Sequence, residues 1–143
     1  MPDVTGIDHI YLSVNDLAIS ERFYDQVLVQ ILGFRKSHFT LANDPHIQYY
    51  NRHFGFVLRP AKQPTAHNSH ATGLHHFCLR VDTIAEVQQV AEQLQRLGIT
   101  ASAAQYYPEY APDYVATFFT DPNGIELEVT NYRQERRERH DHW

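Results

Sequence analysis

Histidine is the residue of this sequence most able to do chemistry, because imidazole binds transition metals and exchanges protons near neutral pH. The chain has 143 residues and ten histidines, and two of these stand at matching positions of an internal repeat. Residues 6–18 align with residues 73–85, which places His9 over His76. Two neutral imidazoles and one carboxylate form a ligand set for a divalent metal ion, with open positions for substrate or water. The repeat therefore indicates His9 and His76 as candidate metal ligands.

Each repeat is expected to fold as a βαβββ module, which predicts an α+β protein. Helix start signals stand at residues 15–16 and at Thr83, and Gly33 and Gly98 are natural helix stops. A turn is expected at residues 43–45. In the first module we expect strands at 7–14, 34–40, 46–50 and 54–59 and a helix at 17–32. In the second module we expect strands at 74–81, 99–103, 114–120 and 125–131 and a helix at 83–97, with Val87, Val90, Ala91 and Leu94 facing inward.

Strand alternation decides which polar side chains share a face, because successive residues of a strand point to opposite sides. In the first strand of each module the apolar residues occupy one side, which leaves His9 and His76, and not His75, on the other. In the last strand the same reasoning places Glu126 and Glu128 on the polar side. Each of these residues alone could face water, but a glutamate flanked by Leu and Val in a strand needs a partner. The alternation favours a metal site of two histidines and one of these glutamates.

One domain is expected over residues 1–143. Module one spans 6–59, a polar linker spans 60–72, module two spans 73–131, and a charged tail spans 132–143. The linker and the tail have very few apolar residues, so we expect both to be solvated.

Composition excludes several classes of partner. The formal net charge is −5, with 43% hydrophobic and 20% charged residues. An acidic chain without a basic stripe does not suit nucleic acid, and no apolar run is long enough to cross a membrane. The single cysteine, Cys78, excludes an intramolecular disulfide and a cysteine-based zinc site, and the first residues do not read as a signal peptide. We therefore expect a cytoplasmic protein that binds neither nucleic acid nor membranes.

An Asp-Pro-Asn-Gly turn at residues 121–124, followed by a strand with two glutamates, is the most specific motif of the chain. The segments that belong with it are 8–14, 16–24, 32–34, 76–81 and 119–128. In this order they resemble the vicinal oxygen chelate superfamily, also called the glyoxalase/bleomycin resistance/extradiol dioxygenase superfamily, over residues 6–131. In this family, paired βαβββ modules form a curled mixed sheet cup with the helices on the outside and one divalent metal ion within.

The resemblance also implies which residues bind the metal ion. His9 and His76 match the ligands of the two first strands, and Glu128 stands four residues after the turn glycine, where the family's glutamate sits. The other glutamate of that strand is the reserve candidate. Glyoxalase I takes a fourth ligand, a glutamate from the last strand of the first module, but this chain has no glutamate between Glu21 and Glu86. The three-ligand set resembles extradiol dioxygenases and fosfomycin resistance transferases instead.

The first helix departs from the family pattern as well. The usual Val-Leu-Gly-Phe at its end is stretched here over residues 27–34, which adds about one helical turn.

The resemblance implies a metal-dependent enzyme acting on a small oxygenated substrate, with extradiol-type dioxygenase chemistry as the first expectation. A lyase, isomerase or resistance-type transferase on the same site is the alternative, and so is a metal-free binding protein of the bleomycin resistance type. The metal ion is expected to be Fe, Mn, Zn or Ni, since the ligand types do not choose among these. Candidate catalytic side chains are Tyr107, Tyr114 and His53. The aromatic loop 106–114 is interpreted as a pocket lid, a packed turn or a dimer contact, and a homodimer is expected.

Overall fold

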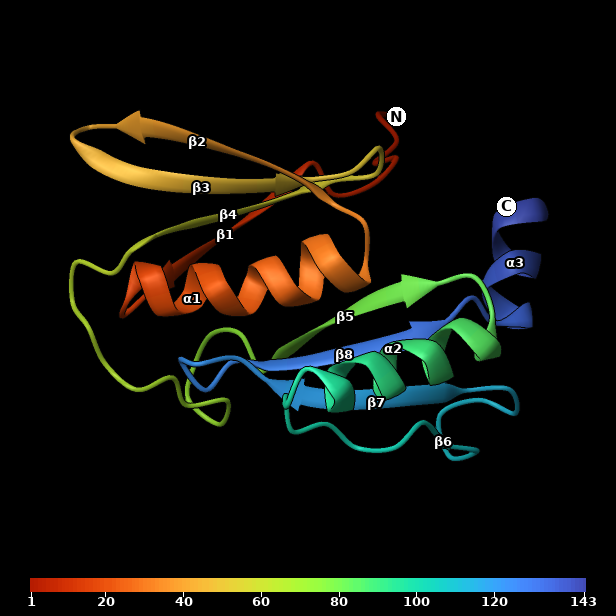
Figure 1. Cartoon of the computed structure of the whole chain (residues 1–143). Coiled ribbons are helices and arrows are strands. Elements are labelled where there is room, and N and C mark those ends of the chain that lie inside the picture. Colours follow the sequence, from red (N-terminus) through yellow and green to blue (C-terminus); the bar gives the residue numbers. More distant parts are fainter. The chain divides into compact units, whose positions relative to one another are not determined.

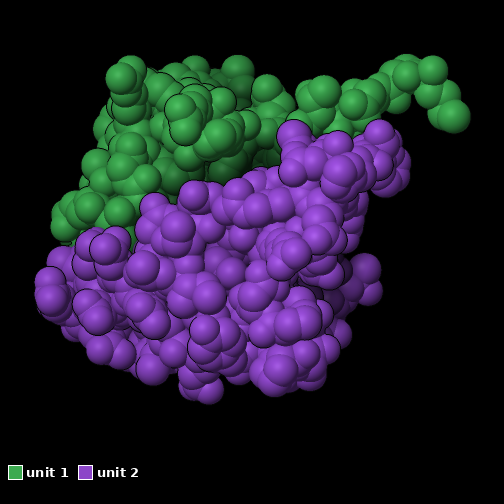
Figure 2. Space-filling view, turned by 90° about the vertical axis from the view of Figure 1, so that its right-hand side faces the viewer, with its two compact units in different colours: residues 1–66 green, residues 67–143 purple.

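Alternating apolar side chains build two four-stranded mixed sheets, one in each repeat of the chain (Figure 1). The computed structural model describes residues 1–143 and divides into two units, residues 1–66 and 67–143, which are coloured separately in Figure 2. Each unit contains a strand, a helical segment and then three strands. The α+β architecture of two βαβββ modules is therefore the one that the sequence predicts.

The elements of the first unit are β1 (His9–Val14), α1 (Leu17–Tyr24), the π-helix η1 (Asp25–Ile31), β2 (Arg35–Leu41), β3 (Asp44–Tyr50) and β4 (Gly55–Pro60). The elements of the second unit are β5 (His76–Val81), α2 (Ile84–Arg96), β6 (Gln105–Tyr106), β7 (Val115–Thr120), β8 (Glu126–Asn131) and α3 (Gln134–Asp141).

Both sheets have the same strand order. It is β1-β4-β3-β2 in the first unit and β5-β8-β7-β6 in the second, so the first and last strands of each module lie side by side. These two strands run parallel, with His9 opposite Gly55 in one sheet and His76 opposite Glu126 in the other. The shared order places the two candidate histidines on equivalent edge strands of their sheets.

Helix α1 packs against the first sheet because the strands alternate apolar and polar residues (Figure 1). The buried strand residues on this side are Leu12, Val14, Ile47, Phe56 and Leu58. The carboxylate of Asp16 caps the helix by accepting a hydrogen bond from the backbone N–H of Ile19 at 3.0 Å, an interaction worth about 1 kcal/mol. The opposite face of β1 carries the exposed side chain of His9, as the alternation predicts.

The helix expected at 17–32 changes type halfway. It is α-helical to Tyr24 and continues as the π-helix η1. The wider turn is visible where the N–H of Leu32 donates to the carbonyl of Val27, five residues back, at 3.1 Å. Gly33, with φ of 72°, then ends the helix. The extra residues at this helix end are thus taken up by a wider helical turn as well as by added length.

The hairpin between β2 and β3 turns earlier than the sequence suggests. Its two turn residues are Ala42 and Asn43, with φ of 51° and 65°, and Leu41 pairs with Asp44. Positive φ at both central residues is typical of the two-residue turns whose twist matches that of a hairpin. The turn predicted at 43–45 therefore begins one residue too late. Proline can lie on β3 at position 45 because the pairing there requires no backbone N–H.

Helix α2 follows the sequence closely. Thr83 and Glu86 form a reciprocal capping box at its N-terminus, and the four residues expected to face inward, Val87, Val90, Ala91 and Leu94, are all buried. Gly98, with φ of 76°, ends the helix.

The strand that the sequence predicts at 99–103 is not formed. Only Ala101 makes an isolated bridge, to Phe119, and the edge strand β6 comes later and has two residues. Ser102 makes the difference: its hydroxyl and its backbone N–H bond the backbone N–H and carbonyl of Phe118, each at 2.9 Å. At this position a side-chain oxygen takes the place of the carbonyl that a regular ladder would supply to Phe118.

The charged tail forms the exposed helix α3, which the sequence interpretation does not include. Arg137 anchors it by donating to the carboxylate of Asp82 at 2.5 Å and lying over the ring of Tyr132. None of the three α-helices or η1 has the length and apolar character that a membrane span requires.

Candidate metal centre

Glu128 and His76 lie next to each other on the face of the second sheet that α2 does not cover. Nε2 of His76 is 3.4 Å from Oε2 of Glu128. The Glu128 side chain is only 4% exposed, whereas that of His76 is 35% exposed. A buried carboxylate is costly unless neighbouring groups stabilise its charge. The structure therefore brings together two of the three predicted ligands, with His76 open to solvent on one side.

Tyr114 provides the strongest contact of Glu128. Its hydroxyl donates a hydrogen bond to Oε1 at 2.5 Å. Burial, and then the Glu128 carboxylate, raise the pKa of Tyr114 above its usual value of 10.0, so the phenol is protonated at neutral pH. The guanidinium of Arg133 lies 4.4 Å from the centroid of the Tyr114 ring and fixes it from the other side. Tyr114 is thus a permanent donor to one oxygen of Glu128.

Cys78 stands opposite Glu128 in the strand register. Cys78 is exposed on this face, but desolvation by its neighbours, and then the Glu128 carboxylate, raise the pKa of its thiol above the usual range. The thiolate is the form that binds metals and attacks electrophiles. Cys78 is therefore a neutral side chain of this face at neutral pH.

His75 is a residue of this cluster that the sequence interpretation missed. Its Nδ1 lies 2.7 Å from Nδ1 of His76, and Glu126 completes a group of ligand atoms that all lie within 4.8 Å of one another. Alternation excluded His75 because it stands next to His76. Strand β5 begins at His76, however, so His75 does not follow the alternation of the strand. An arrangement of two imidazoles and a carboxylate can hold a divalent ion.

In the first unit, His9 lines a pocket of about 500 Å³. Its Nδ1 lies 2.6 Å from the carboxylate of Asp8. His53 lines the same pocket, and its Nε2 accepts a hydrogen bond from Arg52 at 3.3 Å. Because arginine can only donate, Nε2 is the unprotonated nitrogen of this His53 ring, and its lone pair receives the N–H of Arg52. The structure thus places two sequence-predicted residues, His9 and His53, in one pocket.

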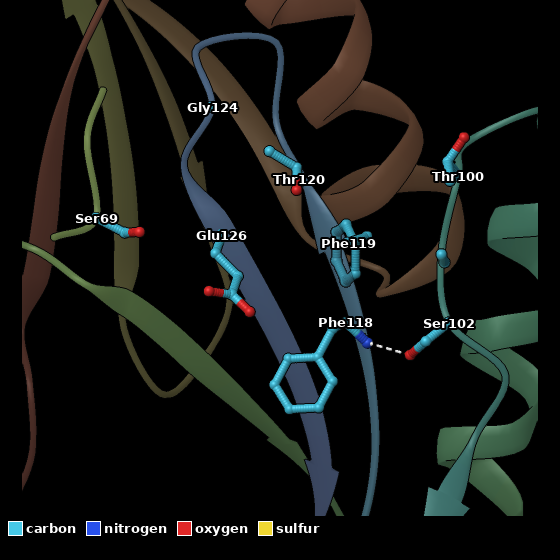
Figure 3. Close-up of a pocket in the computed structure, with 9 residues that line it drawn as sticks. Ser69, Thr100, Ser102, Phe118, Phe119, Thr120, Gly124 and Glu126 are labelled. Atoms are coloured by element: carbon cyan, nitrogen blue, oxygen red, sulfur yellow. Dashed lines mark hydrogen bonds between the residues drawn. The ribbon is translucent and has the colours of Figure 1, made fainter. Parts of the chain in front are cut away.

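The second unit has a pocket of about 360 Å³ against β7 and β8 (Figure 3). The sheet contributes Phe118, Phe119, Thr120 and Glu126, the segment after α2 contributes Thr100, Ala101 and Ser102, and Ser69 and Gly124 complete the lining. Glu126 is the one ionisable side chain among them. A pocket with an aromatic ring, hydroxyl groups and no cation suits a small neutral molecule rather than an anion.

Tyr107 is a predicted catalytic residue that the structure does not place on Glu128. Its ring stacks on Tyr110 at 5.6 Å and meets the ring of Phe118 edge-on at 5.5 Å. Its backbone N–H donates to the carbonyl of Tyr114 at 2.8 Å. Burial, and then the neighbouring Tyr110, raise the pKa of Tyr107, so this phenol is protonated as well. Residues 106–114 therefore form an aromatic turn in which Tyr107 packs on Phe118, a residue of the second unit's pocket, while Tyr106 and Tyr110 are exposed.

The equal strand orders identify the counterpart of Glu128 in the first unit. Gly55 stands opposite His9 as Glu126 stands opposite His76, so Val57 takes the position of Glu128. Val57 is 2% exposed and β4 carries no carboxylate. The first unit therefore offers His9 but no acidic ligand from its last strand.

The fold has many solved counterparts. A glyoxylase/bleomycin resistance protein/dioxygenase domain from Frankia sp. EAN1pec superposes with a TM-score of 0.75 at 21% identity, covering 92% of this chain and 100% of that one. A mutant of the fosfomycin resistance protein FosX from Listeria monocytogenes, complexed with Mn(II) and 1S,2S-dihydroxypropylphosphonic acid, has a TM-score of 0.70 at 14% identity, covering 96% and 99%. A lactoylglutathione lyase from Agrobacterium tumefaciens has a TM-score of 0.67 at 21% identity, covering 91% and 96%. Likeness at these identities concerns the fold.

The family of the chain is shown by its sequence. A family model described as the Glyoxalase/Bleomycin resistance protein/Dioxygenase superfamily matches residues 6–129, which include both modules and the strand with Glu128. This family is the one that the repeat and the turn motif indicate. The chain belongs to the glyoxalase/bleomycin resistance protein/dioxygenase superfamily.

Proposed function

We propose that this protein is a metal-dependent enzyme acting on a small oxygenated molecule, with one divalent metal ion bound by His9, His76 and Glu128. The observation that carries the proposal is the buried carboxylate of Glu128 beside Nε2 of His76. Tyr114 occupies Oε1, which leaves Oε2, the oxygen nearest His76, for a cation. Two imidazoles and a carboxylate leave about three positions of an octahedral ion open.

The open positions suit a substrate that binds through two neighbouring oxygens. When bound, the metal ion would supply Lewis-acid stabilisation of such oxygens and, as ferrous iron, an electron for dioxygen. The protein side chains would position the ligands and transfer protons. Tyr114 holds Glu128 in place, and His53 is the candidate general base in the pocket beside His9. The Tyr107 phenol is a neutral donor next to Phe118.

Extradiol-type ring cleavage is the specific activity that we propose. The pocket of the second unit presents Phe118, three hydroxyl-bearing residues of the sheet and the preceding segment, and no cationic side chain. This lining favours a neutral catechol over a phosphonate. In such a reaction dioxygen is the oxidant, and both of its atoms end in the product as one ring C–C bond breaks. The proposed enzyme works as a cytoplasmic homodimer on a freely diffusing substrate.

A second candidate function is a lyase, isomerase or resistance-type transferase on the same metal site. It is favoured by the pocket beside His9, where Arg52 and His53 could bind an anionic oxygenated substrate.

Metal binding is the first test. Chelator-stripped protein is reloaded with Mn²⁺ and its metal content is measured by mass spectrometry. We expect one ion per chain in the wild type and a loss of stoichiometric binding in His9→Ala, His76→Ala and Glu128→Gln. His140→Ala, an exposed histidine of α3, is the matched control and should bind like the wild type. If the wild type takes up no stoichiometric metal, or if the three variants take up as much as the control, the metal site does not exist as proposed.

Activity is the second test. The protein is loaded with Fe²⁺ without oxygen and then given a panel of catechols in air, while visible absorbance and oxygen uptake are recorded. Yellow ring-cleavage products formed with equal consumption of dioxygen would support the dioxygenase. A loaded protein that is inert toward the whole panel but converts an anionic substrate such as an epoxyphosphonate would support the second candidate instead. Tight binding of aromatic compounds that does not depend on metal would favour a binding protein.

A further inference from the structure

Each of the two candidate ligand histidines is held at Nδ1 by the residue directly before it. Nδ1 of His9 lies 2.6 Å from a carboxylate oxygen of Asp8, and Nδ1 of His76 lies 2.7 Å from Nδ1 of His75. Asp8 and His75 stand at equivalent positions of the repeat. The same local arrangement thus occurs once in each unit, although the two residue types differ.

A ring held at Nδ1 presents Nε2, and this matters for metal binding. An imidazole coordinates through one nitrogen, and a partner of its other N–H fixes both the tautomer and the orientation of the ring. The Asp8 carboxylate can only accept, so Nδ1 of His9 carries the proton and Nε2 keeps its lone pair. For His76 the nitrogen next to Glu128 is also Nε2. In both units the nitrogen left for a metal ion is therefore the same one.

An ion bound by His75, His76 and Glu126 themselves would need a different arrangement. Those ligand atoms lie within 4.8 Å of one another. However, the two Nδ1 atoms are at hydrogen-bond distance from each other. A hydrogen bond between them uses the same nitrogen of His76 that such an ion would need. The hydrogen bond is the interaction that the geometry favours at this position.

We infer that Asp8 and His75 are positioning residues, which hold His9 and His76 so that both rings present Nε2 to the metal ion. This inference rests on the metal site proposed above. The two residues differ in strength: the Asp8 carboxylate accepts from the imidazole N–H in a charge-assisted hydrogen bond, whereas the His75 ring can accept or donate. Asp8 should therefore contribute more to affinity than His75.

Because the contact between Asp8 and His9 is exposed, its effect on metal binding can be separated from any effect on folding. The side chains of Asp8 and His9 are 94% and 52% exposed, so their contact contributes little to folding. Removing Asp8 should leave the melting temperature unchanged, and an effect on metal binding can then be assigned to the ring. The Co²⁺ affinity of chelator-stripped protein is measured by titration, with the visible spectrum of bound Co²⁺ as a second signal.

We expect Asp8→Ala and His75→Ala each to weaken Co²⁺ binding by about 10- to 100-fold, the effect typical of losing such a partner. Asp8→Asn and His75→Gln, whose amide oxygens can still accept from Nδ1, should recover part of that loss. His70→Ala is the matched control, because its ring contacts that of His75 but not that of His76. Equal loss in the alanine and amide variants would overturn the inference, because a residue that only supports the local fold would behave in that way.

Nitrogen NMR of the histidine rings in the metal-free protein separates this inference from the proposed function. We expect His9 to be the Nδ1–H tautomer in the wild type and a mixture of tautomers in Asp8→Ala. If His9→Ala and His76→Ala lose Co²⁺ while Asp8→Ala and His75→Ala retain it at full affinity, the metal site stands and the positioning role is wrong. If none of the four variants alters Co²⁺ binding, the metal site fails, and the NMR result still decides whether Asp8 sets the tautomer of His9.

Discussion

At the scale of single residues, the proposed metal site depends most on the buried side chain of Glu128. Strand alternation alone predicted that it shares a face with His76, because the period of two is a property of every strand. The sequence could not predict its partner Tyr114, because a hydrogen bond between residues far apart in the chain leaves no local pattern. It missed His75 for a related reason, since the alternation does not extend past the end of β5.

Tyr114→Phe tests how far Glu128 depends on that partner. The variant keeps the ring under Arg133 but removes the donor to Oε1. We expect metal affinity to fall by about 10- to 100-fold and the free energy of unfolding to fall by about 1–3 kcal/mol, because a buried carboxylate loses a hydrogen bond. Calorimetric titration and chemical denaturation measure the two effects. Tyr110→Phe, an exposed neighbour in the same turn, should change neither.

At the scale of elements, caps and apolar patterns predicted most of the secondary structure. Helix α2 is the clearest case, because its capping box, inward face and terminal glycine all act within a few residues. The wide turn of η1 could not be predicted from the sequence. Extra residues in a helix can either lengthen it or widen one of its turns, and the sequence pattern is the same in both cases. The helix α3 has the residues of a solvated tail and depends on anchors such as that of Arg137 on Asp82.

The β2–β3 turn offers a direct gain in stability. Ala42 has φ of 51°, where its Cβ is strained. Ala42→Gly should raise the free energy of unfolding by roughly 0.5–1 kcal/mol, because relief of the strain exceeds the entropy that glycine adds to the unfolded chain. Thermal unfolding measures the change. Ala66→Gly is the matched control at ordinary φ and should be neutral or destabilising; an equal gain there would contradict this explanation.

A charge cluster ties the helical segment of the first unit to its sheet. Lys36 lies 2.6 Å from Glu21 and 2.8 Å from Asp25, and His38 lies 2.9 Å from Glu21. Hydrogen bonds from Lys36 and then His38 hold the pKa of Glu21 below its usual value of 4.5. A lowered pKa means that the stabilisation is complete above pH 4.5 and is lost as the pH falls through the folded-state value.

Glu21→Gln should therefore flatten the pH dependence of stability in the acid range. We expect the free energy of unfolding of the wild type to fall more steeply below pH 4.5 than that of the variant. Denaturation series at several pH values measure this slope. Glu92→Gln, at an exposed position of α2, should keep the wild-type slope. Parallel slopes in all three proteins would show that this cluster does not set the acid stability.

At the scale of the whole molecule, the internal repeat predicted the architecture. Matching residues in 6–18 and 73–85 imply equal modules, and the equal strand orders of the two sheets agree with this. The repeat also reduced the ten histidines to one candidate pair of metal ligands. One histidine in a strand is weak evidence for a ligand, whereas histidines at the same position of two matching strands are stronger evidence. The strand expected at 99–103 shows the limit of the pattern, since the Ser102 hydroxyl accepts the N–H of Phe118 in place of a ladder carbonyl.

A homodimer is the expected state in solution. Tyr106 and Tyr110 are 62% and 60% exposed on the aromatic turn, which gives the surface an apolar area suited to a contact. Light scattering after size exclusion should give about twice the chain mass of 16.7 kDa. Replacing both tyrosines by serine should weaken the association and leave far-ultraviolet circular dichroism unchanged. A wild-type mass of one chain at high concentration would contradict the expectation.

The equivalence of Val57 and Glu128 has a consequence for how such a chain can diverge. Two halves with the same strand register can drift apart one side chain at a time, because a change in one sheet leaves the hydrogen bonds of the other intact. An acid at both positions would give a centre with four protein ligands, and an apolar residue at one of them frees a coordination position. In the metal site proposed above, exchanging a single buried residue between acid and valine would therefore set how many oxygens a substrate can share with the ion.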